Sequence, residues 1–536
     1  MSINSDGFEG LLRKTLKISL VILVFFLLPS SIKSSTQPSV QRLQSSYEAR
    51  EPYDFGPKGT VVKQIFKESE PYPLSASANS FRQHEVAYSP DPPSPDSIVI
   101  EGDTDFVLQG WPGSGTQTDP YRIEDLIINE SGARGVSIQD TTVFFVIRNC
   151  TILNCREGIY LQALSNGLVE NNTFNSNIRG IFFYYVNNSS ITHNFFSNNW
   201  LAVDFRGSEH NLIVNNTFQN TEETEIFFIY SSSNLVANNM CTRSNIDGLY
   251  GMFFSNSGMN TLTGNAIQTS EYYIDSPQVL VENNTIDGEA LHYKFSDQDT
   301  QIIDEKGQFI LFNCTNIKIE NCEGIIHTYD CAHLNFYKNS WLSRYCDMQI
   351  IRGHSFTIIG ERCLGPGGGI ALFDGVNHSI QGSTFFNKTW GIRGDNLWYS
   401  AIINNNISLN SDEGLGLFGY YWRNTRIQLN VFNENGIHAA FYEGDPIISF
   451  NYWSNYTGDD ANNDGIGDQP HLIFTHENTT YFDPHPLMNP NNRENTMHNF
   501  LTVDALNQLI FGTGILFVIL ALIITILYLT RRAFKR

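Results

Sequence analysis

A run of oxygen-bearing residues towards the C-terminal end has the spacing of a cation-binding loop. Hard cations such as calcium take roughly six to eight oxygen ligands, which an EF-hand-type loop supplies at alternate positions. The glutamate expected near the end of such a loop is absent, because His471 stands there. We predict a structural calcium ion here, with Asp483 or a neighbouring turn completing the shell; a solvated turn is the alternative. The predicted ligands are Asp460, Asn462, Asp464, the Ile466 carbonyl and Asp468.

A second set of chemically versatile residues recurs at intervals of 22 positions. Carboxylates beside a cation can perform acid–base chemistry on a saccharide, so Asp330, Arg352 and Asp374 are candidate catalytic residues. Two of these repeats would separate the carboxylates by about 10 Å, which is wide even for an inverting pair. An ionic ladder in which Arg352 bridges the two acids is the alternative, and we predict ligand binding over catalysis. The candidate ligand-binding residues beside them are His354, Asn396 and Trp398.

Aromatic residues are grouped along the same part of the chain. A ring that faces outward can stack on the apolar face of a sugar, whereas alternate rings must fill the core. Outward members of these groups are therefore candidate glycan contacts. The groups are Phe182 with Tyr184, Phe227 with Tyr230, Trp398 with Tyr399, and Tyr420, Tyr421 and Trp422.

A repeat of about 22 residues must position these side chains. Phe174, Phe196 and Phe218 end the similar phrases VENNTF, ITHNFF and IVNNTF, and the interval between them is 22 residues each time. A second phrase, glycine followed by isoleucine or leucine, recurs between them, as at Gly158 and Gly391. A fixed period of this length is typical of a solenoid.

The local pattern indicates a parallel β-helix. Apolar residues alternate over only three to five positions, and asparagine and glycine end each run, which is strand and turn chemistry. Asparagine tolerates a left-handed backbone, and its amide can bond to the asparagine of the next rung. We therefore predict an all-β solenoid of roughly fifteen rungs of about 22 residues each.

The phrases from Ser97 to Leu487 resemble the right-handed parallel β-helix proteins of the periplasmic copper-binding NosD and carbohydrate-binding and sugar hydrolase (CASH) group. Three further stretches carry the resemblance: GWPGSGT with DPYRIE at 110–124, the segment 283–322, which looks like a protruding hairpin and return, and the ending at 451–487. The resemblance implies a right-handed coil, and its function ranges over lyases, hydrolases, adhesins and maturation factors. The histidines and methionines form no His-x-His or Met-rich run, which argues against copper delivery.

Composition and the chain ends bear on location. The net charge of −22 argues against nucleic acid as a partner. Basic residues precede the apolar run Ile18–Leu28, which predicts a signal peptide or an uncleaved anchor. Leu509–Thr530 has the length of a transmembrane helix and basic residues follow it, so we expect a single-pass membrane protein with a cytoplasmic C-terminus. The bulk of the chain would then lie outside the cell.

These signals divide the chain into seven parts. We predict a signal peptide at 1–33, a Pro/Ser-rich linker at 34–95, the β-helix at 96–456, a calcium-loop cap at 457–487, a stem at 488–508, a transmembrane helix at 509–530 and a basic cytoplasmic tail at 531–536.

Asn-x-Ser/Thr triplets and cysteines fit an exported protein. Glycosylation acceptors include Asn171, Asn215, Asn283, Asn377 and Asn455. Eight cysteines allow about 105 pairings, and we interpret most of them as small core residues. Cys150 with Cys155 is the one local pair that could form a disulfide.

Three functions remain open on the sequence. The first is a surface β-helix that binds glycans or surface proteins without chemistry. The second is a polysaccharide lyase or glycoside hydrolase acting on the same face, and the third is a NosD-like envelope accessory factor. The common pectinase signatures are missing, and the one Asp-Asp step lies in the predicted calcium loop. We therefore rank binding above catalysis.

Overall fold

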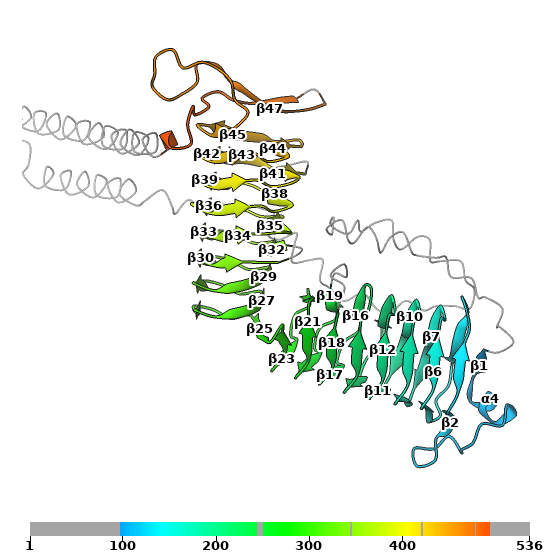
Figure 1. The fold of residues 1–536 in the computed structure, drawn as a ribbon. Helices are drawn as coiled ribbons and strands as arrows, with labels where there is room; N and C mark the ends of the chain where they lie inside the picture. The colour runs from blue at the N-terminus through cyan, green and yellow to red at the C-terminus, as the bar shows by residue number, and fades with distance from the viewer. Residues whose placement is uncertain (1–96, 244–249, 344–345, 420–421, 478, 494–536) are drawn as a thin grey trace, which may run out of the picture. The chain divides into compact units, whose positions relative to one another are not determined.

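The computed structural model describes residues 97–243, 250–343, 346–419, 422–477 and 479–493. They form two successive coils of parallel strands followed by a hairpin (Figure 1). Among these described residues no helix is long and apolar enough to span a membrane. The predicted signal peptide and transmembrane helix lie outside the described ranges.

The first coil has three sheets, each built from one strand per rung. We call them sheets A, B and C. Sheet A contains β1 (Ile98–Glu101), β4 (Arg134–Gln139), β7 (Glu157–Ser165), β10 (Arg179–Asn187), β13 (Leu201–Arg206), β16 (Thr224–Ile229), β19 (Tyr250–Ser255) and β22 (Glu271–Ile274). Sheet B contains β2 (Tyr121–Glu124), β5 (Phe145–Arg148), β8 (Gly167–Glu170), β11 (Ser190–Thr192), β14 (Leu212–Val214), β17 (Leu235–Ala237), β20 (Thr261–Thr263) and β23 (Leu280–Glu282). Sheet C contains β3 (Ile127–Asn129), β6 (Thr151–Leu153), β9 (Thr173–Asn175), β12 (Phe195–Ser197), β15 (Thr217–Gln219), β18 (Met240–Thr242), β21 (Ala266–Gln268) and β24 (Thr285–Ile286). The short helix α4 (Asp103–Leu108) follows β1.

The second coil repeats this plan with sheets D, E and F. Sheet D contains β25 (Glu289–Phe295), β27 (Lys306–Phe312), β29 (Glu323–Tyr329), β32 (Cys346–Ile351), β35 (Gly368–Phe373), β38 (Trp390–Asp395), β41 (Glu413–Phe418) and β44 (Ile437–Phe441). Sheet E contains β26 (Gln301–Ile303), β28 (Lys318–Glu320), β30 (Asn335–Tyr337), β33 (Thr357–Ile359), β36 (Ser379–Gln381), β39 (Ala401–Ile403), β42 (Arg423–Gln428) and β45 (Asp445–Ser449). Sheet F contains β31 (Ser340–Trp341), β34 (Arg362–Leu364), β37 (Thr384–Phe386), β40 (Asn406–Ser408), β43 (Val431–Asn433) and β46 (Tyr452–Trp453), and the hairpin is β47 (His471–His476) with β48 (Thr479–Asp483).

The predicted period sets the register of both coils. Phe174, Phe196 and Phe218 are directly paired neighbours in sheet C, and their rings are stacked 4.7 and 4.8 Å apart. The recurring glycines stand where successive rungs approach most closely. A Cβ on Gly158 would lie 2.6 Å from the carbonyl oxygen of Gly180, so a side chain there would push the rungs apart.

The coil is interrupted once, which the period did not predict. β24 pairs antiparallel with β25, and the first two rung-to-rung steps of the second coil, β25 to β27 and β27 to β29, are only 17 residues long. This hairpin coincides with the segment that resembles a protruding hairpin and return. Gln308 joins the two coils, since its side chain accepts from the Tyr272 amide at 2.9 Å and donates to the Tyr272 carbonyl at 2.6 Å.

Asparagine performs two separate tasks that the sequence interpretation merged. In the pair Asn171–Asn172, Asn171 has φ 55° and is exposed, whereas Asn172 is buried. The Asn172 amide group donates to the side-chain oxygen of Asn194 at 3.0 Å, and Asn194 donates in the same way to Asn216 at 3.0 Å. We call this column of buried amides the Asn ladder. Its members are Asn172, Asn194, Asn216, Asn239, Asn265 and Asn284.

The cysteines are core residues. All eight lie within the described ranges and carry free thiols, so the suggested pairing of Cys150 with Cys155 is wrong. The Cys150 amide donates to Asn172 and the Cys155 amide donates to Asn177, so each cysteine begins a different ladder. The five glycosylation triplets named above all begin at exposed asparagines.

Candidate functional site

The structure places the four residues of the 22-residue series in one column. Asp330, Arg352, Asp374 and Asn396 each follow a sheet D strand, with φ between 51° and 54°. The amide of each of the first three donates to the residue that precedes the next member, at 3.0, 2.8 and 2.9 Å. The polar side chains are therefore stacked at one turn of four successive rungs.

Within this column the side chains pair as a ladder. Arg352 donates from Nε and Nη2 to the two carboxylate oxygens of Asp330, at 2.6 and 2.7 Å. Asn396 donates to Oδ1 of Asp374 at 3.0 Å. The Arg352 and Asp330 side chains are 42% and 38% exposed, so this ion pair is a surface pair, not the buried cation that the sequence suggested.

A neighbouring column carries apolar and aromatic surface. Single parallel bridges connect His354 to Val376 and Val376 to Trp398. Val376, Trp398 and the adjacent Tyr399 are 39%, 38% and 57% exposed, and His354 is exposed as well. We call His354, Val376, Trp398 and Tyr399 the turn platform. It lies directly beside the Asp330–Asn396 column.

The arrangement favours binding over acid–base catalysis. A glycosidase needs two carboxylates that face one bond, with one of them available as a proton donor. Asp330 is instead engaged in a two-point pair with Arg352. Burial and the nearby Asp374 carboxylate raise the pKa of Asp395, but this residue lies on sheet D, beside the column. What the column offers a ligand is hydrogen-bonding groups next to ring faces.

Other aromatic groups divide between surface and core. Tyr230 is exposed, whereas Phe182 and Phe227 point out of sheet A yet are buried. Trp422 belongs to the core of the second coil, where its indole nitrogen donates to the Tyr442 carbonyl at 3.0 Å. Tyr420 and Tyr421 lie outside the described residues.

The predicted calcium loop is held by hydrogen bonds to its own backbone. Asp460 accepts from the amides of Asp464 and Gly465, at 3.1 and 2.9 Å, and Asp468 accepts from Ala461 at 2.7 Å. No group of three His, Cys, Asp or Glu side chains within the described ranges is gathered around a metal position. The donor set has the right chemistry, but calcium would have to replace these amide bonds. Calcium at this loop therefore stays a prediction.

Asp483 is not available as the extra calcium ligand. It is fully buried and accepts from the Asn451 amide, the Asn451 side chain and the Trp453 indole, at 2.9, 3.1 and 3.0 Å. It therefore ends the buried polar column of the second coil, and this part of the calcium interpretation is wrong.

Replacing Asp464 with alanine is expected to lower the melting temperature more in calcium than in chelator, because binding to the folded loop stabilises it. Asp464 also accepts from the Ile466 amide at 2.9 Å, so a small loss without calcium is expected. Thermal melts of wild type and variant in both buffers provide the check. An equal difference in the two buffers would refute a calcium role.

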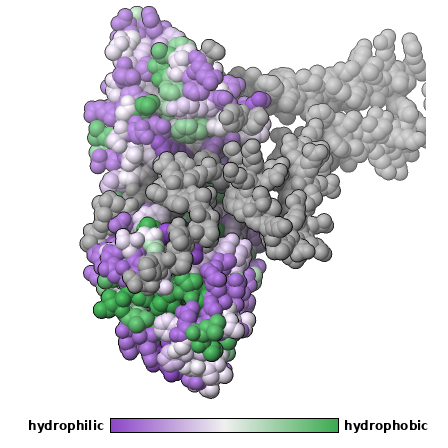
Figure 2. All heavy atoms as spheres, turned by 90° about the vertical axis from the view of Figure 1, so that its right-hand side faces the viewer, coloured by the Kyte–Doolittle hydropathy of each residue, from purple (hydrophilic) through white to green (hydrophobic). Residues whose placement is uncertain are grey.

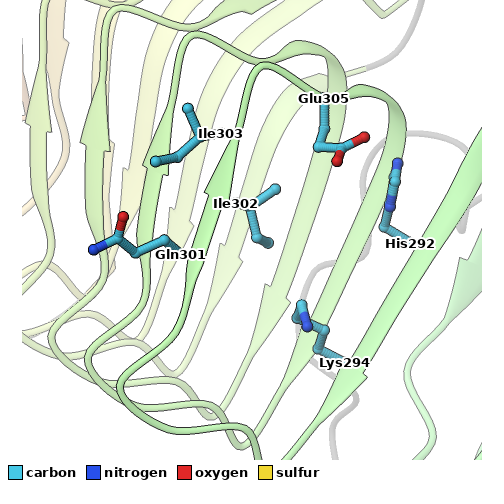
Figure 3. A pocket seen from close by; sticks show the side chains of 6 residues that line it. All are labelled: His292, Lys294, Gln301, Ile302, Ile303 and Glu305. Atoms are coloured by element: carbon cyan, nitrogen blue, oxygen red, sulfur yellow. The ribbon is translucent and has the colours of Figure 1, made fainter.

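A recessed surface opens the second coil, and Figure 3 shows the six residues that line it. His292 and Lys294 lie on β25, and Ile302 points towards them from β26. The His292 ring stacks on Phe309 at 4.7 Å, and Lys294 pairs with Asp297 at 2.9 Å. These polar side chains thus cover the apolar end of the coil, which a solenoid terminus requires.

A charged and aromatic cluster on the outer face of sheet A was missed by the sequence interpretation. It contains Arg134, Glu157, Arg179, Asp204 and Arg206. The signal was present, since Glu157 and Arg179 are 22 residues apart and pair side by side in β7 and β10. The column of charges in the second coil drew the attention instead, because it repeats more regularly.

Comparison with known proteins bears on the fold. Residues 134–286 match the family model described as a right handed beta helix region. No curated protein matches the chain. The chain is similar to the A-module of the Azotobacter vinelandii mannuronan C-5 epimerase AlgE6, with 11% identity and a TM-score of 0.25, over 61% of this chain and 88% of that one.

Two further solved structures are similar at the same level. One is the catalytic domain of a GH87 alpha-1,3-glucanase variant in complex with tetrasaccharides, with 13% identity and a TM-score of 0.26, over 56% of this chain and 68% of that one. The other is a double mutant of the periplasmic alginate epimerase AlgG, with 10% identity and a TM-score of 0.21, over 71% of this chain and 100% of that one. These similarities concern the fold alone. The family match and the stacked parallel strands together identify residues 134–286 as a right-handed β-helix region, within a β-solenoid of about fifteen turns.

Proposed function

We propose that this protein binds glycans through the turn platform and the polar column beside it. The observation that carries the proposal is the exposed pair Trp398 and Tyr399 next to the Arg352–Asp330 ladder. Indole and phenol rings stack on the apolar faces of sugars, while their polar atoms remain free to bond hydroxyl groups. The guanidinium, carboxylate and amide groups of the column supply directional hydrogen bonds at a spacing of about 4.8 Å per rung.

Catalysis on the same face is the second candidate. Its support is the presence of Asp330, Arg352 and Asp374 in one column, which a lyase or glycoside hydrolase could use. The two-point pairing of Asp330 with Arg352 favours binding, because a carboxylate held in this way is a poor proton donor. Binding of a surface protein and an envelope accessory role are further alternatives for the same exposed platform.

The proposed setting is the cell surface. We propose that the chain is exported, anchored by Leu509–Thr530 with its C-terminus in the cytoplasm, and stabilised by calcium at Asp460–Asp468. The sequence features described above support this setting. In that position the platform would face glycans outside the membrane.

A glycan array probed with the full chain tests the function. It is run beside an assay of reducing-sugar release on acidic and neutral polysaccharides. Binding without release supports the proposal, and release supports the enzyme. Neither binding nor release on a broad array would contradict both.

A further inference from the structure

The outer face of sheet A carries a second column of large side chains, in the first coil. Tyr160, Phe182, Asp204, Phe227 and Phe253 are directly paired neighbours on successive rungs. They point away from the core, because successive residues of a strand face opposite sides and their neighbours, such as Ile181, fill the core. The Phe227 and Phe253 rings stack at 4.8 Å. This face is therefore built from rings, with one carboxylate set among them.

Two buried carboxylates hold guanidinium groups over this face. Asp204 is fully buried and lies 3.2 Å from Nε of Arg206 and 3.0 Å from Nε of Arg179. Glu157 is 4% exposed, accepts from Nη1 of Arg179 at 3.1 Å and lies 3.4 Å from Arg134. The acids thus fix the orientation of the arginines, since a fork held at one edge cannot swing away.

Positive charge exceeds negative charge in this cluster. Arg156 joins it with Nε 3.0 Å from Glu157, so that four arginines face two acids and the described groups sum to 4 − 2 = +2. The whole chain carries −22, so a cationic surface cluster is a local exception. The arginine side chains remain between 18% and 37% exposed, which leaves part of each guanidinium accessible to a ligand.

Rings and cations alternate across the same rungs. The Phe182 ring has Arg179 on one side, at 4.9 Å, and Arg206 on the other, at 5.5 Å. Arg134 stands over the Tyr160 ring at 3.6 Å. Figure 2 shows hydrophobic and hydrophilic residues intermixed on the surface it displays, so mixed faces of this kind are a general feature of the coil. A ligand on sheet A would meet flat apolar surface and fixed positive charge together.

We propose that the outer face of sheet A is a separate binding site for a carboxylated polysaccharide, lying across β7, β10 and β13. A guanidinium fork matches the geometry of a carboxylate, and the ring faces match the apolar sides of sugar rings. An extended polymer suits a row of groups that recurs about every 4.8 Å. The strongly negative chain disfavours a nucleic acid, whose phosphates need a wide basic surface. This site lies on another sheet and another coil than the turn platform, so it goes beyond the proposed function.

Titration of the full chain with polygalacturonate, by affinity electrophoresis and calorimetry, tests this site. Replacing Arg206 with glutamine is expected to weaken binding about tenfold, and raising the salt concentration is expected to weaken wild-type binding. Arg148→Gln is the matched control: Arg148 is 39% exposed and pairs with Glu124 at 2.6 Å on sheet B. Neutral dextran is expected not to bind this site.

Three results would overturn the inference. They are equal binding by the Arg206→Gln variant and wild type, equal loss in Arg148→Gln, or tighter binding of a single-stranded oligonucleotide than of polygalacturonate. Should Arg206→Gln fail to fold by circular dichroism, Arg134→Gln takes its place with the same expectation. Trp398→Ala is expected to leave polygalacturonate binding unchanged, so failure of this site is distinguishable from failure of the turn platform.

Discussion

Replacing Asn194 with alanine is expected to destabilise the first coil by roughly 3 kcal/mol, because buried polar groups would lose their partners. The Asn194 oxygen accepts from the Asn172 amide and side chain, at 2.9 and 3.0 Å, and its nitrogen donates to the Val169 carbonyl at 2.9 Å. Both donors of Asn172 are deeply buried and would have no replacement acceptor of the same reach. Chemical denaturation, with hydrogen exchange followed in peptides covering residues 166–218, measures the effect.

Asn335→Ala is the control for this prediction. Asn335 is only half-buried in β30 and its side chain makes a local bond to the His333 carbonyl at 3.1 Å. A loss of less than about 1 kcal/mol is expected there. If the two variants lost the same stability, the Asn ladder would not be what holds the rungs in register.

Glu361 is expected to make the second coil less stable as pH rises. It is fully buried where the first coil has asparagine, and it accepts from the Trp341 indole at 2.6 Å and from the Asn339 side chain at 3.3 Å. Burial raises the pKa of this carboxyl from 4.5 to about 7. Below pH 4.5 it is protonated in both the folded and the unfolded chain, so its contribution to stability is complete there.

Between these two pKa values the unfolded carboxyl loses its proton while the folded one keeps it. The free energy of unfolding therefore falls by roughly 3 kcal/mol between about pH 4.5 and 7. Glu361→Gln cannot ionise, so it is expected to flatten this part of the pH profile, although its amide faces the Trp341 N–H and lowers stability at every pH. Denaturation at several pH values measures the slope.

Glu320→Gln is the control for the pH effect, since Glu320 is partly exposed and forms an ion pair with Lys318 on sheet E. It is expected to keep the wild-type slope. A Glu361→Gln profile parallel to wild type would show that Glu361 is ionised in the folded chain at neutral pH.

The fold could be predicted because one physical rule repeats. Each rung must place a large apolar side chain under the next, so Phe174, Phe196 and Phe218 recur at a fixed interval and reveal the coil. The hairpin between β24 and β25 breaks that rule, and the first short steps of 17 residues carry no phenylalanine phrase that the period could detect. Local repetition therefore predicted the rungs, but not the place where one coil ends and another begins.

The candidate site was predictable to the same extent. A period of 22 aligns Asp330 with Arg352 and His354 with Trp398 whatever the side chains do, so their shared face followed from numbering alone. Which atoms pair did not follow, because rotamers decide whether Arg352 reaches an acid. The role of Asp483 was missed for the same reason, since a single acid far from the repeats gives no sign that it ends a buried polar column.

Titration of the full chain with the best glycan found on the array is the most direct test of the turn platform. Trp398→Ala is expected to weaken the affinity about tenfold through loss of the stacking ring, and Arg352→Ala is expected to weaken it while changing folding stability by no more than about 1 kcal/mol. Phe386→Ala, which removes a ring of similar exposure (41%) from sheet F, is expected to bind like wild type. Equal affinity of wild type and Trp398→Ala would contradict glycan binding at the platform.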